Sequence, residues 1–479
     1  MVFTSAIFLF VFLLAVLAAY HLLPLLFRQK LNNAPLISTL LLIVASYGFY
    51  GWERYWYVFL IAASTIIDLN CAWWMGRARH ASRRLLFLWI SIVSNLGLLG
   101  YFKYRDFAVD SVNALLHGCG LDGFAGFSTQ LVLPVGISFY TFQSMSYTID
   151  VYRGSVQPVG RRGVAGFVCY VALFPQLVAG PIVRFRDIAD QLIKRTHSIE
   201  KFGTGVFFFM MGFAKKTLIA NQVGVLAESL GQTVAPSLLD AWIGVGAFTL
   251  QIYFDFSGYS DMAIGLGMMF GFVFPFNFNA PYRSHSITEF WRRWHISLST
   301  WLRDYLYIPL GGSRGGRLLT YRNLLITMLL GGLWHGAAWT FVLWGAWHGG
   351  WLAIERLANP RWRPDNWPRA LGQAWTLFIV MIGWVFFDAS SMEQAGDVLS
   401  GLFGLNGDSG AFSLRGPTAA TLPLIVGALG VFIALFARTT QQLAEHITTL
   451  KAVGALLAFI LGVMAMMQSG FNPFLYYQF

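Results

Sequence analysis

Apolar runs of about 17–25 residues recur along the chain and constrain its fold more than any other feature. A helix advances about 1.5 Å per residue, so a run of this length crosses the roughly 30 Å hydrocarbon core of a membrane. Because some runs are shorter or interrupted, we predict an all-α polytopic membrane protein with about 11–13 transmembrane and re-entrant elements. The runs occupy residues 5–27, 35–52, 55–75, 85–102, 131–150, 163–180, 203–222, 239–256, 260–276, 322–334, 338–356, 371–388, 419–437 and 451–468.

Composition supports a membrane protein over other basic proteins. Only 11% of the 479 residues are charged, whereas about a quarter are charged in ordinary soluble domains. Much of the net charge of +11 falls in short stretches between apolar runs, such as Arg77, Arg79, Arg83 and Arg84. That arrangement is typical of cytoplasmic loops that face anionic lipid. Membrane lipid, and not nucleic acid, is therefore an expected partner.

Basic residues also predict how the first part of the chain is oriented. No positive charge precedes the run at 5–27, so we interpret it as a retained first span and not as a signal peptide. Arg28 and Lys30 follow this run, and the basic cluster at 77–84 follows the third run. Both segments should be cytoplasmic, which leaves the N-terminus outside.

Strict alternation fails farther along the chain. It puts residues 150–162 inside and residues 181–202 outside, yet the second segment carries five Lys and Arg residues. One intervening segment is therefore expected to re-enter the membrane and not to span it. The best candidate is 131–138, because Pro134 and Gly136 interrupt helix geometry there.

The pair Trp294-His295 lies in a stretch whose spacing predicts one helix over 288–306. At about 100° per residue, the charged side chains share one arc, and tryptophans, leucines and His295 occupy the opposite side. Ser286 and Glu289 predict a capping box at its start. Such a helix belongs at the membrane interface or lines a cavity. His295 is then either a core histidine bonded to a carbonyl or a reactive group, and the pattern leaves both readings open.

A second pair, Trp334-His335, stands in the sequence Gly-Gly-Leu-Trp-His-Gly inside an apolar stretch. Glycine permits close approach of a neighbouring helix or of a substrate, so structural and functional readings of His335 are equally supported. His348 follows in a similar sequence 13 residues later. On one continuous helix it would lie about 220° away from His335, so we expect His348 to serve packing or to support the site.

Two carboxylates, Asp255 and Asp261, lie among hydroxyl and aromatic residues at membrane depth. They either make a salt link to an arginine of 283–303 or line a wet cavity. No nucleophile elbow, P-loop or dinucleotide motif occurs, and the histidines and three cysteines lack metal-ligand spacing. We therefore expect no metal and no bound cofactor.

These motifs together resemble the membrane-bound O-acyltransferase family, and most of all its bacterial branch that acetylates exopolysaccharides. The resemblance implies a ring of helices around a thin central region, with a funnel that connects the two membrane faces. It also implies a single domain over 1–479, with N-terminal helices in 5–127, a catalytic core in 128–356 and C-terminal helices in 357–479. The matching stretches are 133–140 (LPVGISFY), 146–153 (SYTIDVYR), 177–184 (LVAGPIVR), 253–265 (YFDFSGYSDMAIG), 288–306 and 331–336 (GGLWHG).

The resemblance implies that His335 is the family's near-invariant histidine and that His295 matches its second conserved polar position. His335 would accept the proton of a hydroxyl nucleophile or carry the acetyl group itself. His295 would orient His335 or donate to the developing oxyanion. The expected supporting or tunnel-lining residues are Trp294, Trp334, His348, Asp255, Asp261 and Arg303.

The implied reaction uses a cytoplasmic thioester, either acetyl-CoA or a carrier acetyl thioester, at the bacterial inner membrane. A periplasmic partner protein would then place the acetyl group on a polysaccharide such as alginate or cellulose. The nearest alternative is an acyltransferase directed to D-alanyl transfer or to peptidoglycan. A transporter is the alternative from another class, and it predicts a repeat symmetry that the sequence does not display.

Overall fold

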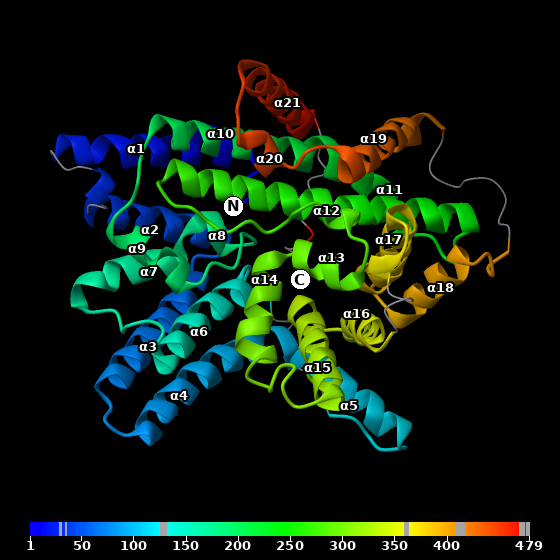
Figure 1. The fold of residues 1–479 in the computed structure, drawn as a ribbon, viewed down its shortest axis with the longest axis horizontal. Coiled ribbons are helices and arrows are strands. Elements are labelled where there is room, and N and C mark those ends of the chain that lie inside the picture. Colours follow the sequence, from blue (N-terminus) through cyan, green and yellow to red (C-terminus); the bar gives the residue numbers. More distant parts are fainter. Residues whose placement is uncertain are drawn as a thin grey trace. The chain divides into compact units, whose positions relative to one another are not determined.

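The computed structural model of the protein describes residues 1–27, 31–33, 36–124, 132–358, 364–407, 417–468 and 475. These residues form helices and connecting segments without any strand (Figure 1). The predicted all-α class is therefore confirmed. The chain divides into two compact units, the first comprising Met1–Gly205 and Leu266–Phe274 and the second Val206–Gly265 and Pro275–Phe479. The three-part division expected from the sequence stays a prediction.

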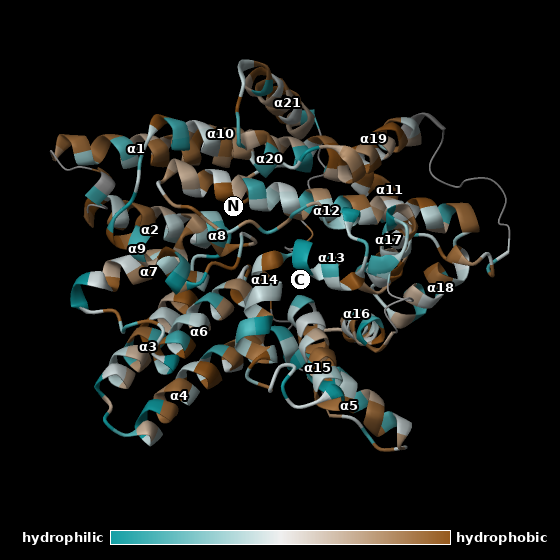
Figure 2. Ribbon diagram, viewed as in Figure 1, coloured by the Kyte–Doolittle hydropathy of each residue, from teal (hydrophilic) through white to brown (hydrophobic). Residues whose placement is uncertain are grey.

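Within the described residues, six helical stretches are long and apolar enough to cross a membrane, so the protein is a multi-pass membrane protein. Apolar residues, brown in Figure 2, dominate helices such as α1 and α4. Two shorter apolar helices cover Leu36–Gly51 and Ala420–Phe436. The six long stretches are Phe8–Leu26, Tyr57–Arg77, Ala81–Gly118, Ile199–Gly231, Arg369–Asp388 and Thr449–Gln468.

The first unit contains the helices from α1 to α9. A π-helical turn, Gly100–Tyr104, joins α4 to α5 without a break. The chain therefore continues as a helix beyond the apolar run at 85–102 as far as Gly118, because apolar residues continue at helical spacing between the polar ones. These helices are α1 (Leu13–Leu26), α2 (Leu36–Gly51), α3 (Tyr57–Arg77), α4 (Ala81–Leu99), α5 (Arg105–Gly118), α6 (Ile137–Arg153), α7 (Val164–Ala172), α8 (Phe174–Leu177) and α9 (Phe185–Ile193).

A buried polar network holds three of these helices together. The Asp68 carboxylate on α3 accepts hydrogen bonds from Ser91 Oγ at 2.6 Å and from Asn95 Nδ2 at 3.0 Å, both on α4. Ser144 Oγ on α6 donates to the same carboxylate. Asp68 and its three partners are at most 1% exposed. Hydrogen bonds between helices at membrane depth therefore fix the packing of α3, α4 and α6.

The run at 163–180 was expected to span the membrane, and the structure corrects this. It consists of α7, with nine residues, and α8, with four. Nine helical residues advance only about 14 Å, less than half the hydrocarbon core. Pro175 ends the continuous helix, since it lacks an N–H and its ring conflicts with the carbonyl four residues earlier.

The basic segments on either side of α7 and α8 lie close together in the structure. Arg162, before α7, and Arg186, after α8, line the same cavity. The expectation that 131–138 re-enters the membrane stays a prediction. In that stretch, Gly136 has a left-handed φ of 76° just before α6 begins. Leu131 lies outside the described residues.

The second unit contains α11 and the helices from α13 onward. The helices α10 and α12 have residues in both units. The runs at 239–256 and 260–276 were expected as two spans, yet α12 is one helix of 32 residues that ends at Met269. The helices are α10 (Ile199–Ala214), α11 (Asn221–Gly231), α12 (Leu238–Met269), α13 (Ile287–Arg293), α14 (Ile296–Leu302), α15 (Arg317–His335), α16 (Trp339–Leu357), α17 (Arg369–Asp388), α18 (Met392–Leu402), α19 (Pro417–Phe436), α20 (Thr440–Ala444) and α21 (Thr449–Gln468).

Close packing explains why α12 continues through the polar residues at its centre. A Cβ atom on Gly258 would lie 2.7 Å from the carbonyl oxygen of Gly212 on α10. Glycine at both positions lets the two helix backbones approach closely. The polar residues around Gly258 are thus in the interior of a helix and do not form a connection between two spans.

Candidate active site

The helix predicted over 288–306 is broken at Trp294-His295, so that prediction is wrong. α13 ends at Arg293 and α14 begins at Ile296. His295 lies between them with φ 40° and ψ 55°, a left-handed conformation that is uncommon for residues other than glycine. Because the helix is interrupted at His295, its imidazole does not project from the helix face that the continuous helix over 288–306 predicted.

Asn277 stabilises this left-handed residue. Its Oδ1 atom accepts hydrogen bonds from the Ser297 backbone N–H at 3.2 Å and from Ser297 Oγ at 2.9 Å. His295 Nδ1 lies 3.1 Å from the same oxygen. The backbone carbonyl of Asn277 accepts from Ile296 N–H at 2.9 Å. The amide group of one residue therefore replaces the helical hydrogen bonds that the break removes.

The same contacts fix the tautomer of His295. Asn277 Nδ2 donates to Ser260 Oγ at 3.0 Å, and the atom that faces His295 accepts from a backbone N–H, so it is the carbonyl oxygen. An acceptor requires a donor, which assigns the proton of the neutral ring to Nδ1. The Nε2 atom of His295 is then the hydrogen-bond acceptor of this ring. Sequence reasoning missed Asn277, which precedes His295 by 18 positions and belongs to none of the quoted motifs.

His335 is the last residue of α15, and the chain reverses over the next three residues into α16. A Cβ atom on Gly332 would lie 2.2 Å from the carbonyl oxygen of Phe341, so glycine is needed for the close approach of the two helices. The rings of His295 and His335 have centroids 6.3 Å apart. The structure thus brings together the two histidines predicted to be catalytic.

His348 lies near His335 because α15 and α16 are two separate helices. The expected separation of about 220° between the two histidines applied only to one continuous helix. The Trp344 ring lies between the two histidines, 5.2 Å from His335 and 5.1 Å from His348. His348 is fully buried, with Trp291 at 5.2 Å. Among the residues with described positions, neither ring nitrogen of His348 nor the indole nitrogen of Trp344 has a hydrogen-bond partner.

Trp294 and Trp334 pack around this cluster. Trp294 stacks on Phe290 at 5.5 Å with an interplanar angle of 18°. Trp334 lies 5.0 Å from His335 and 6.0 Å from His295. Trp334 therefore packs against both histidines, and Trp294 packs against Phe290. Trp291 and Trp344 line the adjoining cavity.

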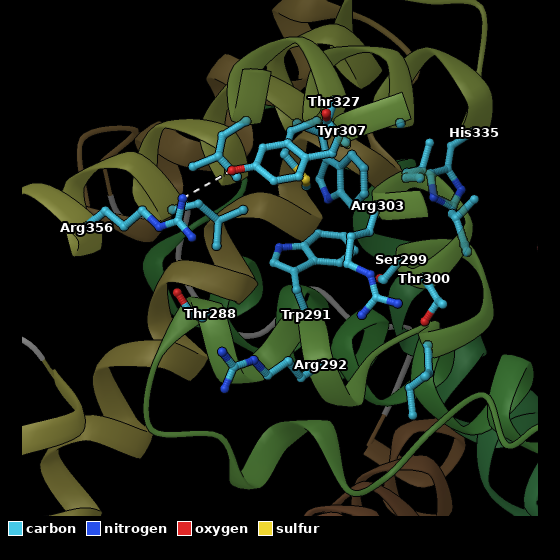
Figure 3. A pocket seen from close by; sticks show the side chains of 18 residues that line it. Thr288, Trp291, Arg292, Ser299, Thr300, Arg303, Tyr307, Thr327, His335 and Arg356 are labelled. Carbon is cyan, nitrogen blue, oxygen red and sulfur yellow. Dashed lines mark hydrogen bonds between the residues drawn. The ribbon is translucent and has the colours of Figure 1, made fainter. Parts of the chain in front are cut away.

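A cavity of about 500 Å³ reaches His335 from the side of α13, α14, α15 and α16. Its volume lies within the range of small-molecule sites. Three arginines line it, Arg292, Arg303 and Arg356, and in Figure 3 His335 lies on the side opposite Arg356. Arg303 Nε pairs with Asp304 Oδ1 at 2.8 Å. The cavity thus combines a cationic rim with an aromatic wall and an imidazole.

A carboxylate from α16 holds α13 in position. Glu355 accepts hydrogen bonds from the backbone N–H groups of Ile287 at 2.6 Å and Thr288 at 2.9 Å, which are the first residues of α13. Ser286 caps the helix by accepting from Glu289 N–H, as predicted. Glu289 itself accepts from His285 N–H at 2.8 Å, so the reciprocal half of the predicted capping box does not form. Sequence reasoning missed Glu355.

Asp255 and Asp261 make salt links to lysines, so the expected arginine of 283–303 is the wrong partner. Lys216 Nζ lies 2.6 Å from Asp255, and Lys215 Nζ lies 2.6 Å from Asp261. The two lysines are consecutive residues of a π-helical turn, Lys215–Ala220. Neither aspartate lines the cavity beside His335. In the described part of the chain, no group of three or more His, Cys, Asp or Glu residues could hold a metal ion.

Comparison with known proteins gives one family. A sequence profile described as the membrane-bound O-acyltransferase family matches residues 138–393. "Probable alginate O-acetylase AlgI" of Azotobacter vinelandii is 44% identical over the whole of both chains. The protein of that name in Pseudomonas aeruginosa is 48% identical over 84% of this chain and 75% of its own. "Peptidoglycan O-acetyltransferase" of Helicobacter pylori is 35% identical over 85% and 81%.

Proposed function

The chain belongs to the membrane-bound O-acyltransferase family, and on that premise we propose that it passes acetyl groups from a cytoplasmic thioester to an exopolysaccharide. It is an O-acyltransferase with a multi-pass membrane fold. The observation that carries the proposal is the cavity that joins three arginines to His335. Acetyl-CoA and carrier thioesters both bear phosphate groups, which arginine recognises through paired N–H donors.

Further basic residues support a cytoplasmic opening for this cavity. Arg314 lies just beyond the π-helical turn Arg303–Tyr307, and Arg317 and Arg322 lie in the first two turns of α15. Basic residues at the ends of membrane helices favour the cytoplasmic side. The donor would therefore enter past the arginines, and its acyl end would reach His335 between Trp291 and Trp344.

The chemistry assigns a proton-transfer role to His335. The oxygen of an acceptor hydroxyl attacks the thioester carbonyl carbon while its proton moves to the imidazole of His335. When the tetrahedral intermediate collapses, the C–S bond breaks, and the thiolate takes that proton as it leaves. A positioned base of this kind contributes about 10²–10⁴ in rate.

Two neighbours are suited to assist His335. His295 presents Nε2 as an acceptor, which favours the orienting role over donation to an oxyanion. The indole N–H of Trp344 is a buried donor next to His335 with no partner among the described residues. It is therefore the group we assign to the developing oxyanion.

The proposed identity of the final acetyl acceptor is based on the names of related proteins. The proteins at 44% and 48% identity are called probable alginate O-acetylases, which supports a secreted polysaccharide as the final acceptor and the bacterial inner membrane as the location. A periplasmic partner protein would complete the transfer. Peptidoglycan is the second candidate acceptor, since a relative at 35% identity is named for it.

The test is the acetyl content of secreted polysaccharide in cells that carry His335→Ala, with the membrane abundance of the protein measured alongside. We expect acetylation to be lost at normal abundance. His80→Ala is the matched control, because His80 is exposed and outside the cavity. Retained acetylation in His335→Ala would disprove the role of this residue. Acetylated peptidoglycan in place of acetylated polysaccharide would select the second acceptor.

A second measurement separates proton transfer from a covalent role for His335. The purified protein is mixed with acetyl donor in the absence of acceptor and analysed by mass spectrometry after an acid quench. A base leaves His335 unmodified, whereas a covalent carrier yields an acetylated peptide. His295→Asn tests the orienting role, because asparagine tolerates the left-handed conformation but lacks the imidazole. We expect a lower kcat with unchanged donor KM.

A further inference from the structure

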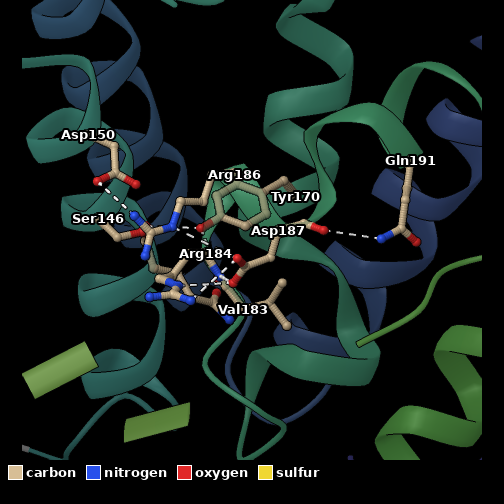
Figure 4. Close-up of polar contacts among 9 residues, drawn as sticks. Ser146, Asp150, Tyr170, Val183, Arg184, Arg186, Asp187 and Gln191 are labelled. Atoms are coloured by element: carbon tan, nitrogen blue, oxygen red, sulfur yellow. Dashed lines mark hydrogen bonds and ion pairs between the residues drawn. The ribbon is translucent and has the colours of Figure 1, made fainter. Parts of the chain in front are cut away.

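Two motifs that the active site does not use meet in the first unit. Residues 146–153 belong to α6, and residues 177–184 lead into α9 (Figure 4). Asp150 Oδ1 lies 3.9 Å from the guanidinium of Arg186. Arg186, two residues beyond the second motif, also lines a cavity that shares no lining residue with the one beside His335.

This second cavity has a volume of about 760 Å³ and lies between α2, the segment before α7, and α9. Arg162 and Arg186 line it, and both are at least partly exposed. Its apolar lining includes Val156, Val159 and Leu192. The cavity is therefore amphipathic, with cationic groups at its edge and an apolar interior.

A buried arginine adds positive charge behind the lining. Arg195 is 1% exposed, and its Nη2 donates to the hydroxyl of Thr39, a lining residue, at 2.9 Å. Its remaining contacts are the Tyr20 hydroxyl, the Gln191 carbonyl and the ring of Phe272. All of these partners are neutral, so the charge of Arg195 has no counter-ion among the residues that the structure describes.

The charges around the cavity do not balance. Arg184 and Arg186 face Asp187 and Asp150. Within the described part of the chain, neither Arg162 nor Arg195 has a carboxylate at ion-pair distance. A buried charge without a counter-ion is costly, and an anion in the cavity would lower that cost.

The surroundings indicate where the anion comes from. Leu36 and Ile193 line the cavity and are 62% and 75% exposed, as expected for side chains that face lipid. The basic segments that contain Arg162 and Arg186 belong on the cytoplasmic side, where the membrane leaflet is anionic. The geometry points to a binding site for one anionic phospholipid, with its phosphate at Arg162 and Arg186 and its acyl chains along Val156, Leu192 and Ile193.

Binding of phosphatidylglycerol to the purified protein, measured by native mass spectrometry in detergent, tests this site. Phosphatidylcholine is the zwitterionic comparison. We expect phosphatidylglycerol to bind more tightly, and Arg162→Gln and Arg186→Gln each to weaken it about fivefold. Arg161→Gln is the matched control, because this neighbouring arginine is exposed but does not line the cavity. Its binding should equal that of the unmodified protein.

Gly160→Trp tests the site without removing a charge. Gly160 lines the cavity, and a Cβ atom there would meet no atom within 4 Å, so the indole has room to fill the cavity. We expect normal melting of the lipid-free protein and loss of phosphatidylglycerol binding. Equal binding of phosphatidylcholine, or an equal effect of Arg161→Gln, would overturn the proposal.

A soluble anion is the competing source of phosphate. If inorganic phosphate or CoA displaces phosphatidylglycerol in proportion to its concentration, the cavity binds a soluble phosphate and the lipid assignment fails. Lipid binding should persist in His335→Ala. The result is therefore independent of the acyl-transfer proposal, and the two can fail separately.

Discussion

Two buried polar sites, one in each unit, differ in whether their hydrogen bonds are satisfied within the protein. In the first unit, the Asp68 carboxylate accepts hydrogen bonds from Ser91, Asn95 and Ser144. In the second unit, the nitrogens of His348 and Trp344 are as deeply buried, yet they have no partner among the described residues. A polar group whose hydrogen bonds are satisfied by its own protein stabilises helix packing. Trp344, unlike His348, lines the cavity beside His335, so its unsatisfied indole N–H is available to a substrate.

The difference follows from the side chains around each group. Serine and asparagine on α4 and α6 are small and polar, so they reach the Asp68 carboxylate directly. Around His348, the neighbours are Phe290, Trp291 and Trp344, whose rings fill space but supply no oxygen acceptor. Aromatic packing therefore leaves the buried donors of this site without acceptors.

Among the proposed substitutions, Trp344→Phe should cause the largest change, a loss of kcat. The phenyl ring keeps the packing against His335 but removes the indole N–H, so kcat should fall roughly 10²-fold with little change in donor KM. Steady-state kinetics of the purified enzyme measure both values. Trp384→Phe is the control, because Trp384 stacks on Trp344 at 6.1 Å but does not line the cavity. Equal losses in the two variants would indicate packing alone.

Asp68→Ala should lower the stability of the protein and leave the transfer rate unchanged, in contrast to Trp344→Phe. Removing the carboxylate breaks the hydrogen bonds to α4 and α6, which lowers the free energy of unfolding by about 2 kcal/mol. The melting temperature in detergent should fall, while the transfer rate per folded molecule stays unchanged. Asp68→Asn, which keeps an acceptor oxygen, should lose less stability. A tenfold lower rate at normal stability would contradict the distinction between the two sites.

Arg356→Gln should give the smallest effect. Arg356 lines the cavity on the side opposite His335 (Figure 3), so its loss should raise donor KM about fivefold and leave kcat unchanged. The effect should shrink as salt is added, because the arginine acts through charge. Arg369→Gln is the control, since Arg369 is exposed and outside the cavity. A changed kcat would place Arg356 closer to the chemistry than proposed.

Local patterns predicted the elements better than their interruptions. The apolar runs gave helices close to their expected bounds, such as Tyr57–Arg77 for 55–75 and Arg369–Asp388 for 371–388. The break at His295 could not be predicted, because helical periodicity continues through it. The break depends on Asn277, whose amide supplies the missing hydrogen bonds from another segment.

Polar partners were equally hard to predict. The carboxylates of Asp255 and Asp261 clearly required cations, and arginines of 283–303 were numerous enough to be the expected source. The π-helical turn that presents Lys215 and Lys216 to them is not marked by any local pattern of residues in the sequence. Which cation reaches a buried carboxylate depends on helix rotation, and the spacing of apolar residues does not define that rotation closely enough.

The sequence by itself determined that the protein crosses a membrane and which family it belongs to. It also identified His295 and His335 as candidates for catalysis. These conclusions depend on the length of apolar runs and on ordered motifs, which are local properties of the chain. Only the tertiary structure decided that His348 and Trp344 join these histidines, and that a second, cationic cavity lies in the other unit. Both depend on chain reversals and on contacts between residues distant in sequence, which no local periodicity records.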